Sequence, residues 1–190
     1  MAENKKSGFT LTEMLVGMAV FSLILVAISG IFVSAIRIQK RTLTANDLSQ
    51  ETSYLLEYMS RTLRMARKDD VGGVDCLGGD KINYEINASS TGIKFRNYKD
   101  LCQEFYLDKT TYQLIERISS STNPLVFSTS TLTSPNLRVN YFNIEILGAP
   151  QGDNQQPRVT ITMEITKPGT SQPKIKVQTT ISQRQLDFTY

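Results

Sequence analysis

The chain has no histidine and no tryptophan, and it has only two cysteines among its 190 residues. Without histidine, imidazole catalysis and histidine-ligated metal sites are excluded. Asp, Glu, Ser, Thr, Lys and Tyr remain, but they form no recognisable catalytic grouping. The sequence therefore predicts a protein that is not an enzyme, with no cofactor and no metal site.

The net charge is also small, at +3, because 21 Lys and Arg stand against 18 Asp and Glu. This mixed balance gives no electrostatic case for nucleic-acid binding. The run Met14–Ile36 carries no charge at all over 23 residues. A helix over this run would be about 35 Å long, enough to cross a bilayer core of roughly 30 Å. We therefore expect one segment that contacts membrane lipid.

The flanks of this run differ from those of an ordinary secretory signal, whose shorter apolar core is followed by a small-residue cleavage site. Here Arg37, Lys40 and Arg41 follow the run, which favours a helix that stays attached. Lys5 and Lys6 precede it. The positive-inside rule would slightly favour the carboxyl side as cytoplasmic, so charge alone leaves the topology open.

A short segment ahead of the apolar run, KKSGFTLTEMLV over residues 5–16, carries a specific resemblance. It resembles the class III signal of type IV pilins and type II secretion pseudopilins, although Thr12 stands where that family more often has a larger aliphatic residue. The resemblance implies that prepilin peptidase cleaves between Gly8 and Phe9 on the cytoplasmic side. It further implies N-methylation of Phe9 and retention of the apolar run.

Glu13 would then be the fifth residue of the mature chain. A carboxylate at the edge of an apolar run is costly in lipid and would protonate or draw in water if it were isolated. Cleavage would give Phe9 a cationic amine at the positive end of the helix dipole, and both attract a carboxylate. The resemblance implies that Glu13 pairs with the Phe9 amine of a neighbouring subunit and sets the axial stagger. The alternative is that Glu13 reaches water or pairs with its own amine.

The same resemblance implies the partners and the location of the chain. The partners would be prepilin peptidase, other pilin or pseudopilin subunits and an inner-membrane assembly platform. The chain would be a single-pass protein of the inner (cytoplasmic) membrane with an extracytoplasmic C-terminal domain, and would enter a filament on assembly. This resolves the topology that charge leaves open.

Helical character continues beyond the apolar run to about Lys68, because apolar residues recur at helical spacing with no Pro or Gly until Gly72-Gly73. The part Tyr54–Arg67 resembles the later helix of J-type pseudopilins and W-type minor pilins, although its apolar positions also fit ordinary core spacing. We expect four segments: a leader (1–8), a transmembrane or filament-core helix (9–36), an amphipathic extension of the helix (37–70) and a β-rich globular domain (71–190).

From Asp80 onward the apolar period changes to two, which is typical of half-buried strands. The Ser- and Thr-rich part 119–134 fits either a loop or the edge of a hairpin. The sequence therefore predicts an α+β fold, pilin-like by resemblance, in which the long helix packs on one or two antiparallel sheets. The expected strands lie at residues 82–86, 92–98, 101–107, 112–118, 137–147, 159–165 and 175–181.

Cys76 and Cys102 lie in the predicted β-rich domain. In an exported domain such a pair suggests a disulfide that closes a loop of about 27 residues. Loop entropy would then contribute about 3–4 kcal/mol. Two buried free thiols are the alternative.

Two functions remain open on this evidence. The first is a minor pilin or pseudopilin subunit of a type IV pilus or a type II secretion pseudopilus. The second is a signal-anchored extracytoplasmic ligand-binding domain that does not polymerise, which would have no need of Gly8, Phe9 and Glu13 in that order.

Overall fold

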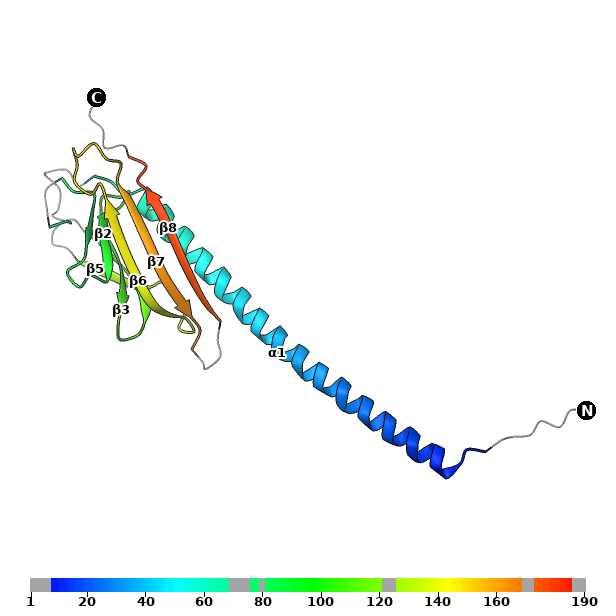
Figure 1. The fold of residues 1–190 in the computed structure, drawn as a ribbon. Coiled ribbons are helices and arrows are strands. Elements are labelled where there is room, and N and C mark those ends of the chain that lie inside the picture. Colours follow the sequence, from blue (N-terminus) through cyan, green and yellow to red (C-terminus); the bar gives the residue numbers. More distant parts are fainter. Residues whose placement is uncertain (1–7, 69–75, 79–80, 121–125, 169–172, 186–190) are drawn as a thin grey trace, which may run out of the picture. The chain divides into compact units, whose positions relative to one another are not determined.

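The computed structural model describes residues 8–68, 76–78, 81–120, 126–168 and 173–185 (Figure 1). The predicted leader, apart from Gly8, and the Gly72-Gly73 stop lie outside these ranges. The chain divides into two compact units, Met1–Leu43 and Thr44–Tyr190. The predicted boundary at residue 70 also lies outside the described residues, so the four-segment division of the chain stays a prediction.

One long helix, α1 (Leu11–Arg64), accounts for the helical part of the fold. Every described residue from Gly8 to Leu43 is exposed. Two of the three serines of the apolar run bond to the helix itself, because the Ser22 and Ser29 hydroxyls each donate to the carbonyl four residues earlier at 2.8 Å. By length and composition, this run is sufficient to cross a membrane. None of its most apolar stretch is buried in the structure.

Within the second unit, α1 has a single buried stripe. Its members recur every three or four residues, which is the spacing of one helix face. They are Leu48, Thr52, Leu55, Met59 and Leu63. The helix ends at Arg64, and a short extended stretch follows in which the Arg67 N–H donates to the Arg96 carbonyl at 2.9 Å. The change from helix to strand-like pairing therefore comes slightly before the predicted end near Lys68.

The described residues form eight strands in two antiparallel sheets. The five-stranded sheet has the order β1-β2-β3-β4-β5, and the three-stranded sheet has the order β6-β7-β8. The α+β fold with antiparallel sheets is thus confirmed. The bounds are β1 (Tyr84–Ile86), β2 (Gly92–Arg96), β3 (Cys102–Asp108), β4 (Gln113–Ser119), β5 (Phe127–Thr131), β6 (Arg138–Leu147), β7 (Arg158–Thr166) and β8 (Lys174–Ser182).

The core of the second unit is a single large cluster that combines the buried stripe of α1 with residues of both sheets. Its aromatic centre includes Phe95 and Phe105, whose ring centroids lie 5.5 Å apart. Tyr84 is also buried, and its hydroxyl donates to the Leu63 carbonyl at 2.8 Å. Burial raises the pKa of the Tyr84 hydroxyl, so it remains a donor to the end of α1.

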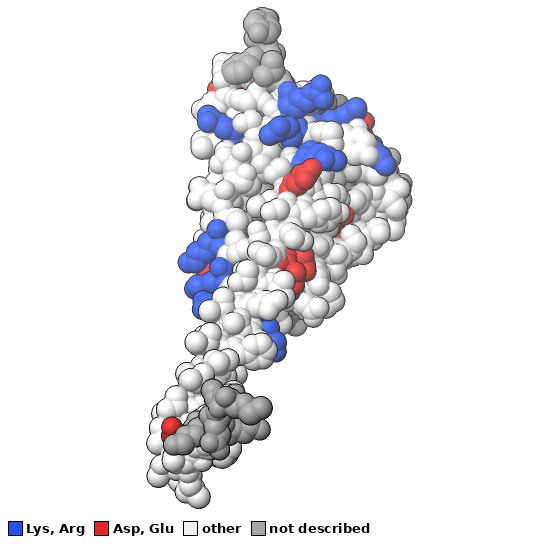
Figure 2. All heavy atoms as spheres, turned by 90° about the vertical axis from the view of Figure 1, so that its right-hand side faces the viewer, with Lys and Arg blue, Asp and Glu red and all other residues white. Residues whose placement is uncertain are grey.

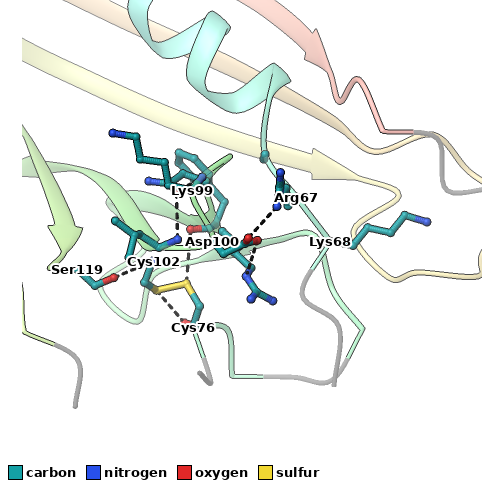
Figure 3. A network of polar contacts seen from close by, with 12 residues as sticks. Arg67, Lys68, Cys76, Lys99, Asp100, Cys102 and Ser119 are labelled. Carbon is teal, nitrogen blue, oxygen red and sulfur yellow. Dashed lines mark hydrogen bonds and ion pairs between the residues drawn. A yellow bond between two sulfur atoms is a disulfide. The ribbon is translucent and has the colours of Figure 1, made fainter. Parts of the chain in front are cut away.

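A smaller apolar cluster surrounds a disulfide between Cys76 and Cys102, whose Cα atoms lie 5.3 Å apart (Figure 3). The Cys102 N–H donates to the Ser119 hydroxyl at 2.9 Å. Next to it, the Asp100 carboxylate lies 2.7 Å from Arg67 Nη1. These contacts attach the turn before β3 both to β4 and to the residues that follow α1.

Candidate functional site

The candidate site lies at the amino end of α1, where Gly8, Phe9 and Thr10 precede the first helical residue, Leu11. Thr10 is the N-cap of the helix. The Thr10 N–H donates to Glu13 Oε2 at 3.1 Å, and the Glu13 N–H donates to Thr10 Oγ1 at 3.3 Å. This reciprocal pair is a capping box, in which both ends of a Thr-x-x-Glu sequence satisfy each other's backbone donors.

The capping box fixes where the Glu13 carboxylate lies in the intact chain. The Thr10 hydroxyl also donates to Glu13 Oε2, at 3.0 Å, so this oxygen accepts two bonds from one residue. No described Lys or Arg forms an ion pair with Glu13. The Phe9 amine expected as its partner does not exist before cleavage, because the Phe9 nitrogen belongs to a peptide bond.

The Gly8–Phe9 peptide bond lies in exposed, non-helical backbone ahead of the cap. Phe9 itself is 88% exposed. A peptidase must bind its substrate in an extended form, and a bond inside a helix would have to unwind first. The position of this bond therefore suits the predicted cleavage.

A shallow apolar hollow follows Phe9 along one face of α1. Gly17 is one of its lining residues, and a Cβ added there would meet no atom within 4 Å. A glycine in such a place lets another helix approach closely, as small residues do in membrane helix pairs. The hollow is lined by Phe9, Glu13, Met14, Gly17, Met18 and Phe21. The Glu13 carboxylate thus borders an apolar surface on which a second helix can pack.

Glu13 is the one charged residue between Gly8 and Ile36. Figure 2 shows that the described atoms at the lower end of the view are nearly all white, that is, uncharged. An acid in that position has no neighbouring charge on its own helix to neutralise it. If the segment lies in lipid, this carboxylate must therefore find a partner, become protonated or reach water.

The structure brings Gly8, Phe9 and Glu13 together within the first unit, as their sequence spacing requires. Cys76 and Cys102 belong to the second unit and form its disulfide. Sequence reasoning missed Thr10 as a member of the site, although the Thr-x-x-Glu pattern was legible. Among the described residues, no group of three or more Cys, Asp or Glu side chains is placed to hold a metal ion.

The comparisons with known proteins agree with this site. The family model described as the prokaryotic N-terminal methylation motif matches residues 4–35. The chain therefore carries the signature of type IV pilins and pseudopilins, which supports a pilin-like substrate of prepilin peptidase that assembles with other pilins. The motif suggests a structural subunit rather than an enzyme. No curated protein and no solved structure matches the chain.

Proposed function

We propose that this chain is a minor pilin or pseudopilin subunit, cleaved between Gly8 and Phe9, N-methylated at Phe9 and assembled into a type IV pilus or a type II secretion pseudopilus. One observation carries the proposal. The methylation motif covers an exposed peptide bond ahead of a long apolar helix whose first turn holds a lone carboxylate, Glu13. The finer resemblance of Tyr54–Arg67 to J-type pseudopilins and W-type minor pilins agrees with a minor role.

The apolar helix supplies the means of both storage and assembly. In the inner membrane, the exposed run would be covered by lipid, with the second unit on the extracytoplasmic side. In a filament, the same surface would be covered by neighbouring helices. Since both environments are apolar, transfer between them costs little free energy in hydrophobic burial. An inner-membrane assembly platform could then move the subunit, with Glu13 providing register.

The capping box adds a step to the role of Glu13. Before cleavage, the carboxylate is held by Thr10. After cleavage, a cationic amine at Phe9 offers a stronger, charge-assisted partner than a neutral hydroxyl. We propose that Glu13 exchanges its Thr10 bonds for the Phe9 amine of an adjacent subunit. The cap would thus order the start of the helix until that amine becomes available.

Cleavage is tested by expressing the chain with and without prepilin peptidase and determining the mature N-terminus by mass spectrometry. An N-methylated Phe9 is expected with the peptidase and an intact Met1 end without it. A chain that keeps its first eight residues beside an active peptidase would overturn the proposal. That result would favour the anchored, non-polymerising ligand-binding domain instead.

The role of the carboxylate is tested by a matched pair of variants. Glu13→Gln keeps an oxygen that can accept the Thr10 bonds but removes the charge, whereas Thr10→Ala removes the capping hydroxyl and keeps the charge. Both should be inserted and cleaved. We expect filament incorporation to fall at least tenfold for Glu13→Gln and to change less than threefold for Thr10→Ala. The opposite order would mean that the cap, not the charge, matters for assembly.

A further inference from the structure

Two adjoining hollows on the second unit share Asn140 and Tyr141, near the start of β6. The first, with a volume of about 370 Å³, is also lined by side chains of the β1–β2 and β3–β4 turns, including Lys109 and Tyr112. The second is also lined by residues of β7 and β8, including Glu164 and Lys176. The two hollows, which both include Asn140 and Tyr141 in their lining, are together called the groove.

A β-bulge shapes the middle of this groove. The register of β6 against β7 shifts between Val139 and Tyr141, so Asn140 is the extra residue. Bulges turn side chains out of the regular alternation and occur often beside functional sites. Asn140 Nδ2 donates to the Thr166 hydroxyl at 3.1 Å, which fixes the amide. Tyr141 is 52% exposed, so much of its side chain remains open to a ligand.

A second tyrosine is held at the rim of the groove at a conformational cost. Tyr112 has a φ of 59°, a left-handed conformation that bulky residues rarely adopt. The Val139 N–H donates to the Tyr112 carbonyl at 2.9 Å, and the Arg138 guanidinium carbon lies 4.6 Å from the ring centroid. The ring is therefore fixed from β6, although 39% of the residue is still exposed.

The chemistry of the groove combines half-exposed aromatic rings with groups that bond to hydroxyls. A sugar ring has an apolar face of C–H groups that stacks on an aromatic ring, and a rim of hydroxyls that both donate and accept hydrogen bonds. Tyr112 and Tyr141 offer the rings. Asn140 offers an amide, and Glu164 with Lys176, 3.2 Å apart, offers an acceptor and a donor.

The groove carries charge of both signs, because Lys109 and Lys176 line it together with Glu164. The Glu164 carboxylate stands among the cations of β8, and the hydrogen bond from Lys176 holds the pKa of Glu164 below its usual range. An ionised carboxylate in the second hollow can accept bonds from sugar hydroxyls. We propose that Tyr112, Asn140 and Tyr141 form the centre of an oligosaccharide-binding site, with sugar units on both sides of Tyr141.

Binding is tested with the full chain in lauryldimethylamine oxide micelles, because detergents with sugar headgroups would compete for the groove. The probes are tetrasaccharides of glucose, N-acetylglucosamine, galactose and mannose, titrated separately. Isothermal titration calorimetry measures binding, because its signal does not depend on the tyrosines that the variants replace. A deoxythymidine decamer serves as the competing class of ligand.

We expect at least one tetrasaccharide to bind, at least tenfold more weakly to Tyr141→Ala and within threefold to Tyr141→Phe, which keeps the ring. Tyr54→Ala is the matched control, since Tyr54 is 72% exposed and does not line the groove, and it should bind within twofold. Circular dichroism checks that each variant remains folded. The proposal is overturned if no tetrasaccharide binds, if Tyr141→Ala binds as the wild type does, or if only the decamer depends on Tyr141. None of these outcomes depends on cleavage at Gly8, so the pilin proposal is tested separately.

Discussion

The Tyr58 hydroxyl donates a 2.7 Å hydrogen bond to Glu116 Oε1 and thereby joins α1 to strand β4. Glu116 is only 6% exposed, and the same oxygen accepts a 2.6 Å bond from Gln103 Nε2. Ser130 of β5 donates to the other carboxylate oxygen at 3.3 Å. Burial, and then the bond to Glu116, raise the pKa of the Tyr58 hydroxyl, so it remains a donor at physiological pH.

Replacing Tyr58 by phenylalanine should lower the free energy of unfolding by about 1.5–3 kcal/mol, because a buried carboxylate loses one of its donors while the ring packing is kept. Urea unfolding of the full chain in micelles, followed by circular dichroism, measures the change. Tyr54→Phe, one helical turn earlier on an exposed position, is the control and should change stability by less than about 0.5 kcal/mol. Equal stability of the two variants would show that Glu116 does not depend on Tyr58.

The regular elements could be predicted from the sequence because their apolar periods are strong. The period-two segments at residues 159–165 and 175–181 lie within β7 and β8. Strand β5 has no apolar period of two, since its last four residues, Ser128 to Thr131, are all Ser or Thr and all exposed. It is an edge strand that pairs with β4. Of the two alternatives for residues 119–134, a loop or the edge of a hairpin, the hairpin edge is therefore confirmed.

The two candidate sites also differ in how far they could be predicted from the sequence. Gly8, Phe9 and Glu13 were legible because they are close in sequence and border an apolar run. The helix begins at Leu11 rather than Phe9, because Thr10 caps it. The Tyr112 and Tyr141 pair could not be predicted, since it depends on a left-handed turn and on a bulge that only the paired strands define.

Gly92 should not tolerate alanine. A Cβ at this position would lie 2.3 Å from the Phe105 carbonyl oxygen and 2.5 Å from Tyr106 Cβ, so β2 and β3 would have to move apart. We expect Gly92→Ala to destabilise the chain by about 1–3 kcal/mol or more. Gly78→Ala is the control, because its Cβ would meet only the flexible end of Glu85, at 3.0 Å. A Gly92→Ala variant that unfolds at the wild-type urea concentration would contradict the close approach.

The disulfide should contribute to stability by closing its loop. We expect the double variant Cys76→Ala, Cys102→Ala to lose about 3–4 kcal/mol of unfolding free energy, and reduced wild type to lose a similar amount. Reductant should leave the double variant unchanged. Thiol titration of the denatured, unreduced chain should find no reactive thiol. Two reactive thiols would instead support the alternative of free cysteines.

The hydrogen bonds to the Asp108 carboxylate predict how the stability of the fold changes in acid. The Thr110 N–H and then the Thr111 hydroxyl, each 2.8 Å from a carboxylate oxygen, hold the pKa of Asp108 below its usual range. Its reference pKa in the unfolded chain is about 3.9. A depressed pKa in the folded state stabilises the fold above the unfolded pKa, and this stability is lost as the pH falls through the folded value.

Asp108→Asn should therefore be less stable than wild type at pH 6, because the amide can accept one of these bonds but carries no charge. The difference should shrink as the pH falls below about 3.9 towards 2, where the wild-type carboxyl also becomes neutral. Melting temperatures from pH 2 to pH 6 measure it. Glu145→Gln removes the same charge from an exposed strand position and controls for net charge. A difference for Asp108→Asn that does not change with pH, or that matches the control throughout, would mean that the turn before Tyr112 does not depend on the ionised carboxylate.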